Sequence, residues 1–356
     1  MTDAPALSDL AGVIHLHSLY SDGTGTVAEI ARAGRANELD YILLTDHDTL
    51  AARDRGEEGW HGDVLVLVGE EVSPRRENHY LAFGLDRPIK HRGLSPQEIV
   101  DRVNEAGGFG FLSHPFSKGS ERFRRGGQGM PWRDLDADGY TGLELWSFVT
   151  DTAERLNSVR ELLNFVIAPG RFIDHPPARN LELWDALSAR RRCVALGGVD
   201  AHQIGVRIGG RVPLRLMSDR RSFRFLRTHL LVERPLTGSI DSDRATIFAA
   251  LQAGHAYIAI DALAPARGFR FWAETDEGGI LTMGDDAPAR ACTLYVRCPR
   301  PARLRLLQDG EEIAGGSELD SLEHATDKPG VYRIEAYREV HGRERTWILS
   351  NPIYLR

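Results

Sequence analysis

Paired cysteines, long apolar runs and a basic leader are all missing from this sequence of 356 residues. Its three cysteines are an odd number without CxxC spacing, which excludes a disulfide framework and a thiolate metal site. No stretch approaches the run of about 20 apolar residues that a membrane helix needs. The opening MTDAPALSDLAG has neither the basic start nor the apolar core of a secretory signal. We therefore expect a cytoplasmic protein without a membrane-bound part.

Lysine is also scarce, because only three of the 44 basic residues are lysine. We attribute this to a bias in composition rather than to function. The net charge of −7 gives no general attraction to nucleic-acid phosphates. These features favour a small-molecule substrate over nucleic acid, and 356 residues leave no room for a polymerase. Nothing in the sequence predicts an oligomeric state.

Short apolar runs alternate with amphipathic stretches over the first two thirds of the chain. The runs with the composition of buried strands are GVIHLH, DYILLTDHD, DVLVLVGEEVS, NHYLAFGL, GFGFLSHP, YTGLELWS and CVALGGVDAH. Ser95 is the expected N-cap of the helix PQEIVDRVNEAG, with Pro96 at its first position. Such strands separated by helices indicate a parallel sheet covered on both faces. Six or seven of these units favour a closed barrel over an open, doubly wound sheet.

The pattern changes after the segment APARG, at residues 264–268. From there the β-type runs CTLYVRC, RLRLLQDGEEI, GVYRIEAYRE and RTWILSNPIYL are separated by turns that contain Gly and Asp. This composition predicts a small antiparallel sandwich. We therefore expect an α/β chain with a barrel domain over residues 1–263 and an Ig-like β-sandwich over residues 264–356.

Histidines and acids gather at the ends of the predicted strands. HLH places two imidazoles on one face of a strand, because side chains alternate, and DAH repeats this spacing. In barrel enzymes the C-terminal strand ends meet at one rim, where the chemistry lies. Each histidine alone could be an ordinary buried or surface residue, but their placement at five strand ends predicts a metal site. The nine candidate ligands are His15, His17, Asp22, His47, Glu71, His79, His114, Asp200 and His202.

Nitrogen and carboxylate ligands without thiolate suit Zn, Mn, Fe or Ni. Nine ligands are more than one ion needs, and they suffice for two or three divalent ions if a carboxylate bridges. A water shared by two ions loses a proton near neutral pH, so no serine or cysteine nucleophile is required. We expect Asp22, Glu71 and His202 to be catalytic as well as ligating.

The motifs HLHSLYSDGT, TDHD, GEEVS, SHP and DAH resemble, in order and spacing, those of the polymerase-and-histidinol-phosphatase (PHP) superfamily. The resemblance covers residues 15–260 and implies a distorted, TIM-like (β/α)7 barrel with two or three ions of Zn, Mn or Fe. It also implies three ligand sets: His15, His17, Glu71 and Asp200; Asp22, His47 and His202; and Glu71, His79 and His114. Many members have histidine where Asp22 stands. The family pattern selects Glu71 rather than Glu70, which is expected to point away.

The segment LQAGHAYIA, the Ig-like tail and the closing SNPIYLR resemble the CehA/McbA-type metallohydrolase branch of that superfamily. We expect a metal-dependent hydrolase, in the first place a phosphoesterase. The resemblance of the tail implies instead a carbamate, amide or ester hydrolase with the same metal centre. A third interpretation is a catalytically silent metal-binding module, which the complete ligand set argues against.

The loop 117–132, directly after His114, is rich in arginine and glycine. Guanidinium groups match phosphoryl oxygens, although the loop could equally be solvated and without function. Its candidates for binding a substrate phosphate are Lys118, Arg122, Arg124 and Arg125. Glu144 ends another predicted strand, and the sequence leaves open whether it faces the metals or the barrel core. His229 and His255 are interpreted as structural.

Overall fold

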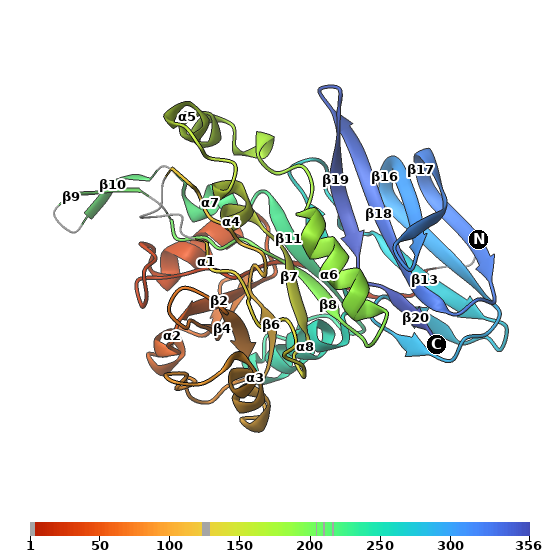
Figure 1. Cartoon of the computed structure of the whole chain (residues 1–356), viewed down its shortest axis with the longest axis horizontal. Helices are drawn as coiled ribbons and strands as arrows, with labels where there is room; N and C mark the ends of the chain where they lie inside the picture. The colour runs from red at the N-terminus through yellow and green to blue at the C-terminus, as the bar shows by residue number, and fades with distance from the viewer. Residues whose placement is uncertain (1–3, 123–128, 204, 209–210, 216) are drawn as a thin grey trace. The chain divides into compact units, whose positions relative to one another are not determined.

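The computed structural model describes residues 4–122, 129–203, 205–208, 211–215 and 217–356 (Figure 1). Contacts divide the chain into two compact units, which we describe separately. The N-terminal unit comprises Ala11–Asn180 and Gly197–Arg227, and the C-terminal unit comprises Met1–Leu10, Leu181–Leu196 and Thr228–Arg356. None of the described helices is long and apolar enough to cross a membrane.

The N-terminal unit alternates strands and helices, as the sequence predicts. Four elements begin in one unit and end in the other: β1 (Ser8–Ile14), α6 (Ala178–Ser188), β8 (Val194–Gly198) and β11 (Leu226–Val232). The other strands are β2 (Tyr41–His47), β3 (Gly59–His61), β4 (Val64–Val72), β5 (Tyr80–Phe83), β6 (Phe109–Leu112), β7 (Gly142–Ser147), β9 (Gly205–Ile208) and β10 (Arg211–Arg215). The helices are α1 (Val27–Arg35), α2 (Ala51–Asp54), α3 (Pro96–Glu105), α4 (Phe148–Ala153), α5 (Val159–Ile167), the short η1 (Pro169–Arg171) and α7 (Asp219–Ser222).

Local sequence explains where the helices of this unit begin. Ser95 and Glu98 form a capping box at the start of α3, with Pro96 in the first turn, which confirms the predicted N-cap. Thr26 and Glu29 cap α1 in the same way. Strand β4 is buried along its whole length, as a continuous apolar run requires.

The sheet of the N-terminal unit is mixed, so the prediction of a uniformly parallel sheet is wrong at β5. Strand β2 pairs in parallel with β1 and β4, and β6 pairs in parallel with β7. Strand β5 is antiparallel to both β4 and β6. The physical reason is the short connection 73–79 between β4 and β5, since a parallel crossover needs about a dozen residues or more.

The segment 199–201, directly after β8, contacts the end of β1 and the start of α4. The backbone N–H of Val199 donates to Ile14 (2.9 Å), and that of Val149 donates to Val199 (3.2 Å). Leu16 and Ala201 form an isolated parallel bridge. The described pairings do not include a ladder that closes the ring, so the α/β class is confirmed while the barrel stays a prediction.

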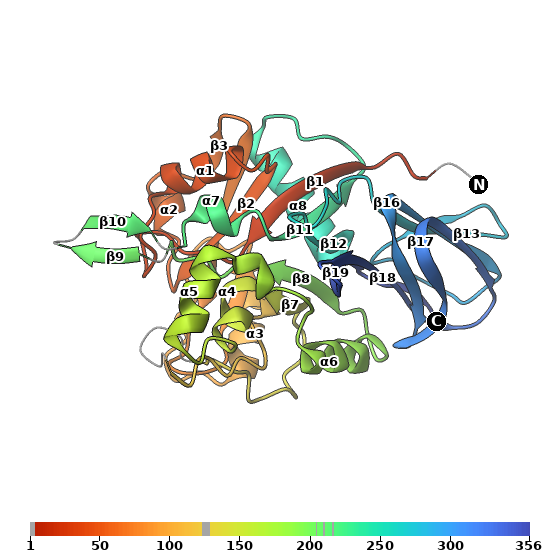
Figure 2. The same ribbon diagram turned by 90° about the horizontal axis from the view of Figure 1, so that it is seen from above.

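The C-terminal unit is rich in antiparallel strands. Its remaining elements are α8 (Ile240–Ala253), β12 (Ala256–Ile260), β13 (Arg270–Thr275), β14 (Ile280–Thr282), β15 (Asp286–Ala287), β16 (Cys292–Gln308), β17 (Glu311–Thr326), β18 (Gly330–Val340), β19 (Arg343–Ser350) and β20 (Ile353–Leu355). Strand β16 pairs with β13, β17 and β18, which lie side by side in Figure 2. Strand β12 pairs with β19, so residues before 264 belong to the same sheet as the tail. The sandwich and the 263/264 domain boundary stay predictions.

Candidate metal centre

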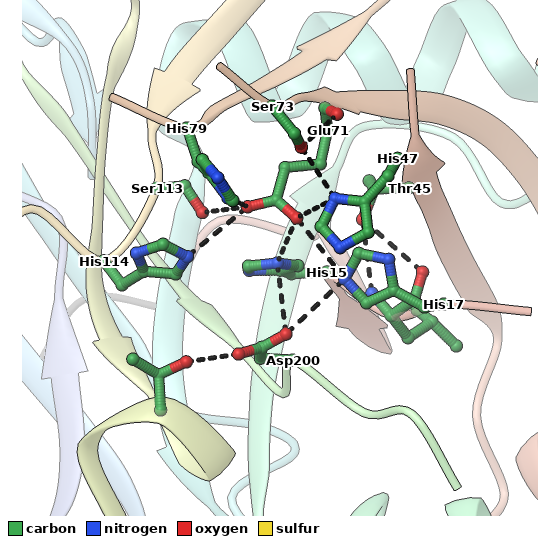
Figure 3. A network of polar contacts seen from close by, with 12 residues as sticks. His15, His17, Thr45, His47, Glu71, Ser73, His79, Ser113, His114 and Asp200 are labelled. Atoms are coloured by element: carbon green, nitrogen blue, oxygen red, sulfur yellow. Dashed lines mark hydrogen bonds and ion pairs between the residues drawn. The ribbon is translucent and has the colours of Figure 1, made fainter. Parts of the chain in front are cut away.

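All nine predicted ligands lie in the N-terminal unit, and the structure brings them together. They fall into four overlapping groups in which one ligand atom of each residue lies within 4.8 Å of the others. Figure 3 shows the rings of His15, His17, His47, His79 and His114 gathered around Glu71, with Asp200 on the other side of His15. The prediction that these strand ends converge is therefore confirmed by the geometry.

Two imidazole nitrogens and two carboxylate oxygens of the cluster lie farther apart than hydrogen-bonded atoms do. The Nε2 atoms of His15 and His17 each lie 3.4 Å from Glu71 Oε2 and 3.5 Å from Asp200 Oδ1. Hydrogen bonds between nitrogen and oxygen are shorter, about 2.9–3.0 Å. A tetrahedron with metal–ligand bonds of about 2.0–2.2 Å has edges of about 3.3–3.6 Å. These four separations match those between ligands of one ion. His15, His17 and Glu71 form one compact group, whereas Asp200 groups with His15 and His114, so the first implied set stays a prediction.

Two buried nitrogen atoms without a hydrogen bond also indicate a metal site. His15 and His17 are completely buried, and neither Nε2 has a hydrogen-bond partner among the described residues. A buried polar group without a partner is costly, and metal coordination supplies the missing partner. The donors present therefore suit a divalent ion bound by imidazole and carboxylate.

The backbone reaches this arrangement by a route that strand alternation does not describe. Strand β1 ends at Ile14, and His15 has a left-handed backbone with φ of 65°. The N–H of His17 donates to Ala201 (2.9 Å), beside the Leu16–Ala201 bridge. The expectation that both histidines lie on one face of a strand is thus wrong, because neither residue belongs to β1. Their Nε2 atoms nevertheless face the same two carboxylates, those of Glu71 and Asp200. His114 and Asp200 also have positive φ, a strain that concentrates at functional sites.

A second group combines Asp22, His47 and His202. Asp22 Oδ1 lies 3.2 Å from His202 Nε2 and 3.6 Å from His47 Nε2. The side chain of Asp22 is 59% exposed, whereas Glu71 is buried. This part of the centre is therefore the part that solvent and a substrate can reach.

Glu71 touches ligands of more than one group. Its Oε1 lies 3.0 Å from His79 Nδ1 and 3.4 Å from His114 Nε2, while Oε2 faces the first set. The implied third set of Glu71, His79 and His114 does not form a compact group among the described residues. Instead His79 groups with His47 and Glu71, and His114 groups with His15 and Asp200. A carboxylate in this position can bridge ions, but the number of ions stays a prediction.

Electrostatics keep the acids ionised. Burial raises the pKa of the Glu71 carboxyl, but the nearby His15 and His79 outweigh burial and hold that pKa well below its usual range. Burial and the neighbouring His202 together lower the pKa of His17 to about 3, which favours the neutral imidazole. Carboxylates and neutral imidazole are the forms that bind metal.

Several residues that hold the ligands were not singled out from the sequence. Ser73 Oγ lies 2.6 Å from His47 Nδ1, and the Thr150 hydroxyl donates to Asp200 Oδ2. Glu144, which the sequence left undecided, lies 2.9 Å from His15 Nδ1. Ser73 and Thr150 lie within the first three residues after a strand, which is the signal that could have found them, whereas Glu144 lies within β7.

Glu70 lies away from the cluster, as expected. Its Oε1 accepts a hydrogen bond from the backbone N–H of Ile89 (2.7 Å). Burial raises the pKa of Glu70 to about 7. Neighbouring residues on strand β4 point to opposite faces, so only Glu71 reaches the histidines.

The proposed phosphate-binding residues are not joined to the cluster in the described part of the chain. Lys118 and Arg122 are exposed, and no described ion pair links their side chains to a ligand. The backbone N–H of Lys118 donates to Glu154 (2.6 Å). Arg124 and Arg125 lie outside the described residues. Their role stays a prediction.

Comparisons with known proteins give distant similarities. No protein-family model matches the chain. An uncharacterized protein of Methanocaldococcus jannaschii is 26% identical over 117 residues, which cover 29% of this chain and 67% of that protein.

Solved structures are similar at lower identity. A two-domain protein from Bacteroides vulgatus, containing a predicted PHP-like metal-dependent phosphoesterase, is 13% identical with a TM-score of 0.47, covering 99% of this chain and 97% of that one. An amidohydrolase from Chromobacterium violaceum, with bound sulfate and no metal, is 16% identical with a TM-score of 0.33, covering 54% of this chain and 87% of that one. The CehA/McbA branch stays a prediction.

Proposed function

We propose that this chain is a metal-dependent hydrolase whose centre is built from the nine predicted ligands. The observation that carries the proposal is the spacing of His15 Nε2, His17 Nε2, Glu71 Oε2 and Asp200 Oδ1 at 3.4–3.5 Å. Divalent ions held here would polarise the scissile bond and lower the pKa of a bound water toward neutrality. The distorted (β/α)7 barrel belongs to this proposal, supported by the backbone contacts of segment 199–201.

The roles of the protein groups follow from their exposure and their contacts. Asp22 is the exposed ligand, so it stands where a substrate enters and can orient it. His202 lies 3.2 Å from Asp22 and is partly exposed, so it can hold a proton at its ring nitrogen or pass it to a leaving group. Glu71 is buried and faces five histidines, so it holds the centre together.

We propose a small phosphate ester as the substrate, in the cytoplasm. The support is the supply of cations in the loop after His114, since a phosphoryl group carries charge that metal ions alone do not surround. The alternative is a carbamate, amide or ester, as the resemblance of the tail implies. A silent metal-binding module is the alternative from another class.

Metal analysis and a substrate screen test the proposal. Protein purified without chelator is expected to contain about two or three divalent ions per chain, the number that nine ligands can hold. It is expected to hydrolyse at least one compound among phosphomonoesters, cyclic phosphates and aryl carbamates. Bound metal without turnover of any of them favours the silent module, and absence of bound metal overturns the proposal.

Phosphate inhibition separates the two substrate classes. For a phosphoesterase, replacing the relevant one of Lys118, Arg122, Arg124 and Arg125 by alanine is expected to cost about 1–3 kcal/mol in kcat/KM, with unchanged metal content. Inorganic phosphate is expected to inhibit the wild type more strongly than that variant. The matched control is Arg343→Ala, an exposed arginine at the start of β19. If phosphate does not inhibit the enzyme and none of the four substitutions changes kcat/KM, the carbonyl substrate is favoured.

A further inference from the structure

Glu144 connects two ligand-bearing strand ends through one buried carboxylate. It lies in β7 and is completely buried. Its Oε1 is 2.9 Å from His15 Nδ1, and its Oε2 accepts a hydrogen bond from the backbone N–H of His114 (2.8 Å). One side chain therefore contacts the residue after β1 and the loop after β6.

The surrounding chain leaves space for this carboxylate. Gly198 ends β8, and a Cβ atom there would lie 1.9 Å from Glu144 Oε1 and 3.0 Å from His15 Cβ. Both groups would have to move if Gly198 carried any side chain. Among the described ion pairs, Glu144 pairs with His15 alone. The imidazole of His15 therefore compensates the cost of burying the Glu144 carboxylate.

The two nitrogen atoms of His15 face different partners. Nδ1 faces Glu144, while Nε2 faces Glu71 Oε2 at 3.4 Å and Asp200 Oδ1 at 3.5 Å. A carboxylate at Nδ1 keeps the proton on that nitrogen and leaves the lone pair of Nε2 free for a metal ion. His17 differs, because neither of its ring nitrogens has a hydrogen-bond partner in the described part of the chain.

We propose that Glu144 is a positioning residue that sets the tautomer and ring orientation of His15 and so determines the affinity of the first metal set. It acts through His15 and contacts no substrate. This inference rests on the proposed metal-dependent function, and it adds a residue that the nine-ligand set does not include. The hydrogen bond from the backbone N–H of His114 to Oε2 positions a second predicted ligand in the same way.

Zinc affinity of the Glu144→Gln variant tests the inference. The amide has nearly the same size, but it can accept from only one of the two donors and turns its own NH2 group toward the other. Apo-protein is titrated with zinc against a chromogenic chelator, and cobalt-loaded protein is examined by visible absorption. We expect zinc to bind about 10–100-fold more weakly, the range for partners that orient a ligating histidine, and the cobalt spectrum to change.

Glu70→Gln is the matched control, since Glu70 is also a completely buried glutamate and bonds to Ile89 instead of a ligand. It is expected to keep wild-type zinc affinity. If circular dichroism shows that Glu144→Gln does not fold, Glu144→Asp replaces it, with weaker zinc binding expected from its shorter reach. Wild-type affinity and an unchanged cobalt spectrum in the folded variant overturn the inference. Failure of the wild type itself to bind zinc overturns the proposed function instead.

Discussion

Each unit of this protein buries a cluster of histidine and carboxylate, and the two clusters differ in their distances. In the N-terminal unit, the Nε2 atoms of His15 and His17 lie 3.4–3.5 Å from the carboxylates that face them. In the C-terminal unit, His229 Nδ1 lies 2.9 Å from Asp9 Oδ1. The first distance is that between two ligands of one ion, and the second is that of a hydrogen bond.

In the Asp9 cluster the carboxylate of Asp9 is saturated by hydrogen-bond donors. Asp9 Oδ2 accepts hydrogen bonds from the backbone N–H of Gly268 (2.7 Å), the Tyr257 hydroxyl (2.8 Å) and Arg270 (3.2 Å). His229 and Tyr257 are completely buried, and their rings stack. A carboxylate with this many donors has no free lone pair directed at an ion. In this cluster too one buried nitrogen, His229 Nε2, has no hydrogen-bond partner among the described residues and lies 3.4 Å from Asp261 Oδ2. The comparison teaches that burial, residue type and one such nitrogen do not identify a metal site, whereas two such nitrogens that face the same two carboxylates indicate one.

The largest expected effect comes from Glu71, which contacts ligands in every direction. Glu71→Gln is expected to abolish tight metal binding, because a neutral amide replaces a carboxylate that faces five histidines: His15, His17, His47, His79 and His114. Metal content after dialysis, measured by elemental mass spectrometry, checks this. His229→Gln is the counterpart in the other cluster and is expected to keep its metal. Equal metal loss in both variants would break the comparison.

The next effect is on stability and concerns Asp9. Asp9→Asn removes the charge shared by His229 and Arg270, and we expect it to lower the free energy of unfolding by about 3–5 kcal/mol, as when a buried ion pair loses one partner. Urea unfolding measures this change. The exposed pair of Asp241 and Arg244 supplies the control, since Asp241→Asn is expected to cost less than about 1 kcal/mol. A cost for Asp9→Asn as small as the control would contradict the role given to this cluster.

The smallest expected effect is the pH dependence of the Asp9 cluster. Burial lowers the pKa of His229, but Asp261 and Asp9 outweigh burial and raise it above 6.5, so its contribution is complete below pH 6.5 and is lost as pH rises through the raised pKa. Burial raises the pKa of Asp9, but His229 outweighs burial and lowers it below 3.8, so its contribution is complete above pH 3.8 and is lost at lower pH.

The stability difference between the wild type and the double variant Asp9→Asn/His229→Gln is therefore expected to be largest from pH 4 to pH 6.5. It is expected to shrink on both sides of this window. Urea unfolding across this pH range measures it. A difference that does not vary with pH would show that the two groups do not form a charged pair.

Much of the metal centre could be predicted from the sequence because the C-terminal ends of neighbouring parallel strands meet at one edge. His47 and Glu71 sit opposite each other at the ends of β2 and β4, as that rule requires. Glu144 could not be decided, because the sequence does not show which face of β7 meets His15. The direction of β5 was missed because a short apolar run looks the same in parallel and antiparallel sheets.

The contact of His229 with Asp9 in the C-terminal unit could be predicted only in part from the sequence. His229 was interpreted as structural, and its buried contact with Asp9 agrees with that interpretation. Its partner could not be named, because Asp9 and His229 lie 220 positions apart and no motif joins them. Long-range contacts of this kind depend on how strands pair, which single-residue patterns do not encode.

A crystal structure of zinc-loaded protein, with anomalous data at the zinc edge, tests the central claim most directly. It is expected to show an ion bound to His15 Nε2, His17 Nε2, Glu71 and Asp200 at about 2.0–2.2 Å. The Asp9 cluster is expected to remain without metal and with its hydrogen bonds unchanged. Zinc bound elsewhere, with these four side chains bonded to one another instead, would contradict the account.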